Sequence, residues 1–318
     1  MIRSLNSAIT GLKNHQTKMD VIGNNIANVN TLGFKRSKVN FSTMFSQTIK
    51  DALDPMGNQI RGGTNAIQLG LGVKIGSIDQ VMTQGMAQST GIDSDFMIQG
   101  NGMFVLDMDG QKIYTRAASF GFDSSGRLED PSSGALVQGY NFADDLTDAS
   151  WPTDLATDPV TGFNIEVPEF GSISLKLGSQ PYLTDPADPT AAPPANLGLI
   201  SYNIDKDGLI TGVYSDGGSV SESHKIAQLA ITKFDNYPGL KNIGGNFYSP
   251  TSNSGLPLIK AAGDDDRGVI SSGTLEGSNV DLAQEFTDMI ITQRGFQANS
   301  KVITTSDTFL QEVIDLKR

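Results

Sequence analysis

The residues most suggestive of chemistry are the aspartates of segment 203–208 (NIDKDG), which have the spacing of the first half of an EF-hand calcium loop. A complete loop of this kind carries a bidentate glutamate at its twelfth position, and this chain has Tyr214 there. The flanking residues alternate like strands, whereas an EF-hand requires helices. The sequence therefore predicts a β-hairpin turn at 206–208 rather than a calcium site. Segment 107–110 (DMDG) is interpreted in the same way.

The remaining candidates for catalysis or ligand binding are isolated. The acidic run 264–266 is expected to be a solvated loop, and the glycine pairs at 70–72 and 100–102 precede no helix that could bind a phosphate. The 2 histidines, His15 and His224, lie far apart with no nucleophile motif beside either. Cysteine is absent, which excludes disulfides, thiol catalysis and zinc–thiolate sites. We therefore expect no enzyme, no catalytic or metal-binding residue, no cofactor and no small-molecule substrate.

The composition indicates a protein with many turns and thin cores. Its 318 residues are 38% hydrophobic and only 7% aromatic, and they include 35 glycines. The net charge of −12 leaves no basic surplus to neutralise phosphates, so no nucleic-acid partner is expected. No apolar run is long enough to span a bilayer, and the N-terminal residues lack the apolar stretch of a cleaved secretory signal.

The elements that stand out are amphipathic segments at the two ends of the chain. Apolar residues recur in heptads at both ends, which predicts helices that each need a partner along one stripe. The C-terminal helix is expected to run for about 35 residues, roughly 50 Å, with Asn279 as its N-cap. The predicted stripe residues are Ile2, Leu5, Ile9, Leu12, Met19 and Ile26 at one end, and Leu282, Phe286, Met289, Phe296, Ile303, Leu310 and Ile314 at the other.

The charges of these two segments indicate that they pair with each other. Basic residues dominate the first forty positions and acidic residues the last forty, which favours pairing between the ends over self-pairing of each. The sequence therefore predicts a filament subunit whose terminal helices form a coiled-coil-like polymer core. An ordinary helix pair closing a globular domain is the alternative.

The middle of the chain has a different pattern. Residues such as Val73, Ile75 and Ile78 alternate with polar ones, and turn signals separate later runs of the same kind, so the middle is predicted to be mainly β. The fold class is α+β, with long terminal helices. The expected segments are 1–30 as the N-terminal helix, 31–70 as a connecting arm, 71–141 and 198–272 as two parts of a β domain, 142–197 as a small inserted outer subdomain rich in proline, and 273–318 as the C-terminal helix.

Two long motifs resemble a known family. Segment 19–35 (MDVIGNNIANVNTLGFK) resembles the N-terminal signature of the bacterial flagellar rod and hook proteins, and segment 278–301 (SNVDLAQEFTDMIITQRGFQANSK) resembles their C-terminal signature. Segments 71–78, 199–214 and 313–318 are more similar to hook proteins than to rod proteins. The long arm is more similar to the distal rod, and the insertion is smaller than the usual hook outer domain. The resemblance therefore favours a hook subunit, with a distal-rod subunit as the alternative.

The resemblance implies a function in assembly. It implies a homopolymer that forms a hollow, flexible tube and transmits torque from the basal body to the filament, or else a stiff drive shaft. Its neighbours would be rod and hook–filament junction proteins, the hook cap and the export apparatus. Export would follow the flagellar type III route to the outside without a cleaved signal. Phe41 and Phe45 in FSTMF resemble an export-gate motif, with an apolar anchor for the arm as the alternative.

Two other classes of function compete with assembly. An adhesive or carbohydrate-binding β module would keep its activity without the terminal helices. A hydrolase would depend on one acidic or hydroxyl residue, and the sequence nominates none.

Overall fold

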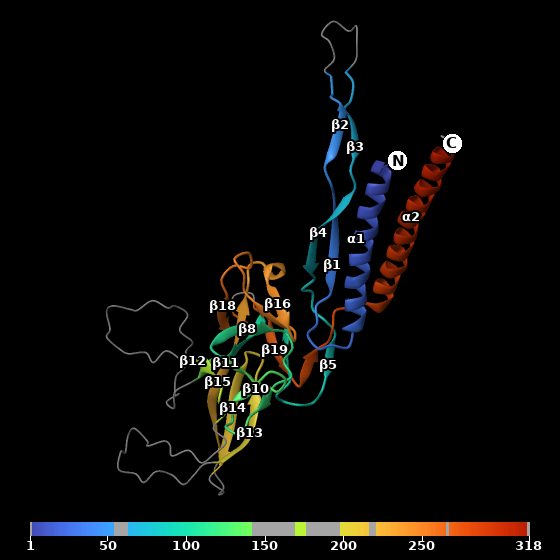
Figure 1. Ribbon diagram of the computed structural model, residues 1–318. Coiled ribbons are helices and arrows are strands. Elements are labelled where there is room, and N and C mark those ends of the chain that lie inside the picture. Colours follow the sequence, from blue (N-terminus) through green and yellow to red (C-terminus); the bar gives the residue numbers. More distant parts are fainter. Residues whose placement is uncertain are drawn as a thin grey trace. The chain divides into compact units, whose positions relative to one another are not determined.

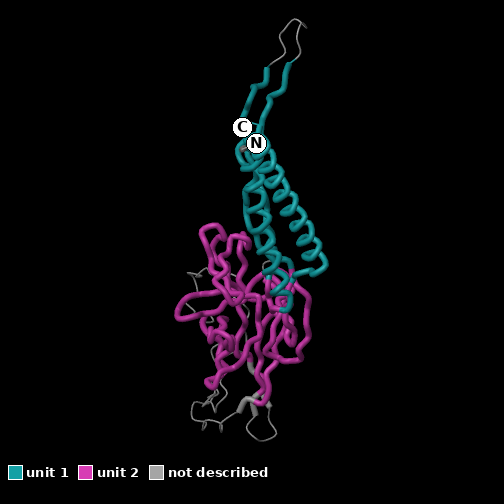
Figure 2. Tube along the Cα trace, turned by 45° about the vertical axis from the view of Figure 1, so that its right-hand side comes forward, with its two compact units in different colours: residues 1–30, 35–83, 279–318 teal, residues 31–34, 84–278 magenta. Residues whose placement is uncertain are grey.

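The computed structural model shows two compact units, which are coloured separately in Figure 2. The residues that it describes are 2–53, 63–141, 169–175, 198–215, 221–264 and 267–316 (Figure 1). Unit 1 contains residues 1–30, 35–83 and 279–318, and unit 2 contains residues 31–34 and 84–278. Most of the predicted insertion at 142–197 lies outside the described residues, and the six-segment division of the chain stays a prediction.

Unit 1 contains two long helices, α1 (Ile2–Ala27) and α2 (Leu282–Asp315), which lie side by side in Figure 1. They are antiparallel, because Gly11 near the start of α1 faces Asn299 in the second half of α2, while Asn25 near the end of α1 bonds to Glu285. The predicted long terminal helices are thus confirmed.

The start of α2 differs from the prediction. The N-cap is Asp281, whose side chain accepts hydrogen bonds from the backbone N–H groups of Ala283 and Gln284. Asn279, the predicted cap, lies two residues earlier. Aspartate and asparagine are both common caps, so sequence preference alone could not distinguish the two positions.

A two-stranded ribbon completes unit 1. β1 (Ser37–Thr43) pairs with β4 (Val73–Gln80), and farther along the same ribbon β2 (Ser46–Lys50) pairs with β3 (Ile67–Gly70), both antiparallel. α1 packs against β1 and β4, whereas β2 and β3 are exposed throughout. The segment predicted as a connecting arm therefore contains strands. Strands β2 and β3 have only five and four residues, too few for a clear alternating pattern, and the sequence pattern detected only β4.

Unit 2 is predominantly β, as predicted for the middle of the chain. Its main sheet has the order β13-β14-β15-β11-β7-β8-β17-β16, and β9, β10, β12 and β18 pair beside that path. β19 pairs with β6 and β20 with β5 in two smaller sheets. The bounds are β5 Ala87–Ser89, β6 Phe96–Gln99, β7 Met103–Met108, β8 Gln111–Thr115, β9 Gly121–Phe122, β10 Leu128–Asp130, β11 Ala135–Asn141, β12 Glu169–Ser172, β13 Gly198–Ile204, β14 Leu209–Ser215, β15 Ser221–Lys233, β16 Lys241–Gly244, β17 Phe247–Ser249, β18 Leu258–Ala261, β19 Val269–Ser272, β20 Thr274–Glu276 and the short 3-10 helix η1 Tyr237–Gly239.

The core of unit 2 is apolar and well filled. Phe96, Phe104 and Phe120 form an aromatic cluster with ring centroids 5.5 to 6.3 Å apart, in tilted and edge-on arrangements that aromatic pairs favour. Fully buried aliphatic residues such as Leu106 and Leu229 surround it. This core gives unit 2 a means of folding that does not depend on other chains.

The two aspartate motifs are hairpin turns, as predicted. At 205–208 the N–H of Gly208 donates to the carbonyl of Asp205 between β13 and β14, and Gly208 has a φ of 72°, which favours glycine. The turn between β7 and β8 is closed by a hydrogen bond from the N–H of Gly110 to Oδ1 of Asp107.

A buried ion pair fixes the strand ends of unit 2. Arg116 Nη1 lies 3.2 Å from Glu276 Oε2, and Glu276 Oε1 accepts from the N–H of Gly85. The carbonyl of Glu276 accepts from the N–H of Gly33, which brings segment 31–34 onto this unit. Burial and then the Glu276 charge raise the pKa of Tyr248 to about 12, so its hydroxyl stays neutral.

Candidate assembly surface

The contact between α1 and α2 is built from small and polar residues. A Cβ added to Gly11 would come within 2.8 Å of Nδ2 of Asn299, and a Cβ added to Gly295 would come within 2.7 Å of Cε1 of His15. Each helix thus places a polar side chain over a glycine of the other. This reciprocal arrangement brings the two helices close together and fixes their register.

Two columns of residues with seven-residue spacing run along α2 where it is least exposed, and the more buried column is polar. Its buried residues are Glu285, Thr292 and Ser306, which with Asn299 recur every seventh position. The flanking column is apolar and only half-buried; it consists of Met289, Phe296, Ile303 and Leu310. Sequence reasoning predicted this apolar column but missed the polar one. The seven-residue spacing of the four polar residues was the signal that could have revealed it.

Other predicted stripe residues of α2 lie on its exposed surface. Leu282, Phe286 and Ile314 are all exposed, with half of the Phe286 side chain accessible to solvent. The contact between α1 and α2 does not bury these residues, so any burial in a polymer core would require a neighbouring chain.

On α1 the predicted stripe borders the intrachain contact. Leu5, Leu12, Met19 and Ile26 are half-buried and Ile9 is exposed, while the side chain of Ile2 is outside the described residues. The most buried positions of α1 are instead Ala8, Gly11, Ile22 and Asn25.

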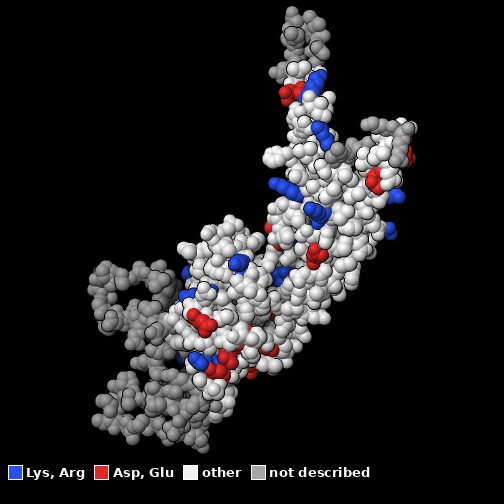
Figure 3. Space-filling view, viewed as in Figure 1, with Lys and Arg blue, Asp and Glu red and all other residues white. Residues whose placement is uncertain are grey.

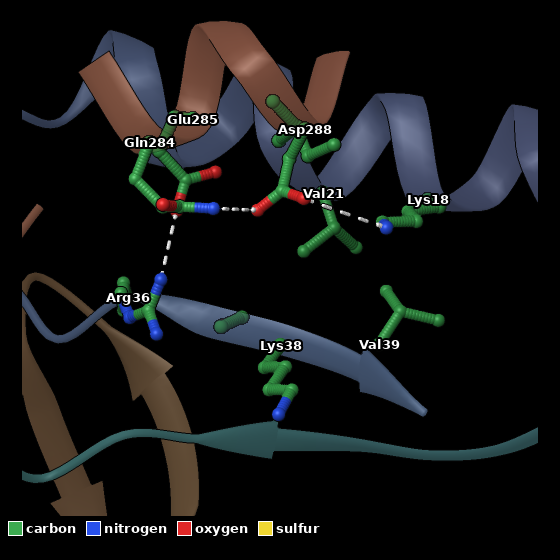
Figure 4. Close-up of a pocket in the computed structure, with 10 residues that line it drawn as sticks. Lys18, Val21, Arg36, Lys38, Val39, Gln284, Glu285 and Asp288 are labelled. Carbon is green, nitrogen blue, oxygen red and sulfur yellow. Dashed lines mark hydrogen bonds and ion pairs between the residues drawn. The ribbon is translucent and has the colours of Figure 1, made fainter. Parts of the chain in front are cut away.

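A polar junction joins the end of α1, the start of β1 and the start of α2. Asn25 Nδ2 donates to the carbonyl of Ser37 at 2.9 Å and to Glu285 Oε2 at 3.2 Å, and the N–H of Ser37 donates back to Asn25 Oδ1. Arg36 Nη1 lies 3.3 Å from Glu285 Oε1 (Figure 4). Only 3% of Glu285 is exposed, so its carboxylate depends on these partners.

Asn279 belongs to the same junction. Its Oδ1 accepts from the N–H of Arg36 at 2.8 Å, and its Nδ2 donates to the carbonyls of Val81 and Thr83. One amide side chain therefore connects the segment before α2 to both strands at the base of the ribbon. This is the role of the residue that the sequence suggested as a helix cap.

A small cleft lies beside the junction. Its volume is about 230 Å³, and its lining includes Val21, Val39 and Lys38 along with the ion pairs Arg36–Glu285 and Lys18–Asp288 (Figure 4). Within the described parts of the chain, no three His, Asp or Glu side chains converge to hold a metal ion. The cleft has no arrangement typical of a catalytic centre.

Large apolar side chains are exposed on unit 1. On the ribbon, Phe45 is 87% exposed, and Ile49 and Ile67 are also exposed. On α2, Phe309 is 54% exposed, as are many of its apolar neighbours. Figure 3 shows a broad area without charged side chains over the helices on the face in view, whereas charged side chains recur along the ribbon. Surfaces of this kind mark sites of protein association.

The exposed residues include the predicted export motif. Phe41 and Phe45 are both exposed, and Phe41 contacts the ring of His15 edge-on. None of the helices in the described residues is long and apolar enough to cross a membrane.

The sequence of this chain matches models of known protein families along most of its length. Residues 5–35 match the flagella basal body rod protein family, residues 97–212 match the flagellar hook protein FlgE/F/G D1 domain, and residues 271–316 match the flagellar basal body rod FlgEFG protein C-terminal family. The chain belongs to the bacterial flagellar rod and hook protein family.

Individual relatives include both hook and rod proteins. The chain is 32% identical to the flagellar hook protein FlgE of Treponema pallidum over 469 aligned positions, and 34% identical to that of Borreliella burgdorferi over 447. It is 40% identical to the flagellar basal-body rod protein FlgG of Bacillus subtilis over 319 positions. Each of these alignments covers 100% of both chains.

Proposed function

We propose that the chain is a structural subunit of the flagellar hook, which polymerises into a hollow, flexible tube and transmits torque. The terminal helices of each subunit form a coiled-coil-like core with those of its neighbours, and unit 2 forms an outer layer. The chain acts through assembly and carries out no catalysis.

The observation that carries this proposal is the exposure of large apolar side chains on unit 1. The contact between α1 and α2 is polar and small, with Glu285 and Thr292 buried, while Phe286 and Phe309 are exposed. Exposing an apolar side chain of this size forfeits about 1.5–3 kcal/mol relative to burying it. A second copy that covers these residues recovers that free energy, which drives polymerisation.

The residues proposed for the polymer core are those of the predicted stripes. Phe286 and Ile314 are exposed and available to a neighbour, and Met289 and Phe296 are half-buried at the edge of the intrachain contact. A residue at that edge contacts its own partner helix and a neighbouring copy at once, which couples folding to assembly.

We prefer a hook subunit to a rod subunit because of the named hook relatives and because a hook must bend. Two relatives named as hook proteins match along their whole length. The distal rod is the second candidate. The alignment to the Bacillus subtilis rod protein spans 319 positions for this 318-residue chain, so almost no gap is needed in this chain. A rod requires stiff outer contacts, whereas a hook requires outer contacts that are easily remade.

The partners and the export route follow from the same proposal. The tube contacts rod proteins at one end and junction proteins or a cap at the other, and subunits leave the cell through the flagellar type III apparatus. Exposed Phe41 and Phe45 are available to an export gate before assembly and to a neighbouring subunit after it.

Electron microscopy of the purified chain at increasing concentration tests the proposal. We expect tubes above a critical concentration, curved and polymorphic if the chain is a hook subunit. Straight tubes would favour the distal rod. A chain that stays monomeric at every concentration would contradict assembly altogether.

A further inference from the structure

His15 occupies a confined position in the contact between α1 and α2. Its ring lies over Gly295 so closely that a Cβ at that position would come within 2.7 Å of Cε1. Phe41 of β1 contacts the ring edge-on, with 5.9 Å between ring centroids. The Nδ1 atom of His15 is buried and has no hydrogen-bond partner. The imidazole is therefore held by packing contacts, and its buried Nδ1 atom gains no hydrogen bond.

The electrostatic surroundings also disfavour a positive charge there. Burial first, and then the charge of Lys18 one turn along α1, hold the pKa of His15 below its ordinary value of 6.5. The packed elements carry further charged residues: Lys38 on β1, Lys74 and Asp79 on β4, and Glu285, Asp288, Arg294, Lys301, Asp307, Glu312 and Asp315 on α2. None of these shifts the His15 pKa, and Asp288 is already paired with Lys18 at 4.0 Å.

We infer that His15 makes the pairing of the terminal helices sensitive to mild acid: the neutral imidazole fits over Gly295, and the protonated one weakens the pairing. Because the folded protein binds the proton less readily than the unfolded chain, the contribution of His15 to stability is complete above pH 6.5. It is lost as the pH falls from 6.5 toward the lower pKa of the folded state. This inference rests on the proposed function, because the polymer contains this helix pair in every subunit.

The test measures the critical concentration for polymerisation at pH 7.5 and pH 5.5. Aspartate and glutamate side chains titrate mostly below about pH 5, so the groups that titrate in this interval are the histidines and the terminal amino group. The His15 variants separate the effect of His15 from that of the amino group. For the unaltered chain we expect a critical concentration several-fold higher at pH 5.5. His15→Gln, which cannot be protonated, should remove most of that difference. His15→Lys carries the charge permanently and should raise the critical concentration at both pH values.

His224→Gln is the matched control, since the sequence has 2 histidines and His224 lies in β15 of unit 2. This variant should keep the full pH difference. The inference is overturned if the unaltered chain shows no difference, or if His15→Gln shows the same difference as the unaltered chain.

Failure of the proposed function would be distinct, because no polymer would form at pH 7.5. Ordering of the terminal helices could then not come from assembly, and the inference would require α1 and α2 to pair within the single chain. Amide hydrogen exchange of residues 2–27 in the unpolymerised chain would test that requirement. Protection should fall between pH 7.5 and 5.5, after correction for intrinsic exchange, in the unaltered chain but not in His15→Gln. Equal protection at both pH values, or none at either, would overturn the inference.

Discussion

The two units of this protein differ in how they treat their large apolar side chains. Unit 2 buries Phe96, Phe104 and Leu106 completely, in the usual manner of a domain that folds alone. Unit 1 buries Asn25 and Glu285 beside a few small or aliphatic residues such as Ile22. It leaves three of its phenylalanines, Phe45, Phe286 and Phe309, exposed. Under the proposed function, this difference means that unit 2 folds within one chain, whereas unit 1 needs neighbouring copies to cover its apolar side chains. This contrast is tested by substituting a residue in one unit and measuring whether polymerisation or the unfolding of unit 2 changes.

The largest effect is expected from Phe296→Asp, which should abolish polymerisation. The side chain is half-buried at the edge of the helix contact, and a carboxylate there would be desolvated by any neighbour that packs against it. Sedimentation and electron microscopy measure the loss. The circular dichroism of unit 2 and its urea transition should not change.

Ile200→Asp is the matched control for that variant, because Ile200 is an exposed apolar residue of unit 2. It should still polymerise. If Phe296→Asp formed normal tubes, or if Ile200→Asp abolished them to the same extent, the division of roles between the units would be wrong.

Leu106→Ala tests whether unit 2 is stabilised by its own apolar core. Leu106 is fully buried in the core of unit 2, so its truncation should lower the free energy of unfolding by about 2–5 kcal/mol. Urea denaturation of the monomer measures this change. Leu12→Ala in α1 is the comparison and should leave the same transition unchanged, because in the monomer unit 1 contributes little to it. Equal losses for both variants would contradict the contrast.

A smaller effect is expected from Glu285→Ala at the polar junction. The substitution removes the acceptor for Asn25 and Arg36 and should cost about 1–3 kcal/mol per subunit, which raises the critical concentration about tenfold or more. Asp288→Ala is the control. Its pair with Lys18 is 4.0 Å long and partly exposed, and should contribute at most about 1 kcal/mol. A larger effect at Asp288 than at Glu285 would show that the junction is not the main polar contact.

The sequence predicted those features that depend on local pattern. The length of α2 followed from heptads, and the turn at 205–208 followed from a dipeptide that favours positive φ. The junction was missed because Asn25, Arg36 and Glu285 are distant in the chain, and no periodicity links them. The pairing of β2 with β3 was missed because both strands are short, of five and four residues, and are far apart in the chain.

The central claim is that the terminal helices become ordered through assembly, while unit 2 is folded beforehand. Limited proteolysis of the monomer tests it most directly, since isolated amphipathic helices do not offset their ordering entropy. We expect cleavage from both ends back to about Leu71 and Ser272, leaving a stable β fragment, and protection of the same ends in the polymer. Terminal segments that resist proteolysis in a monodisperse monomer would contradict the account.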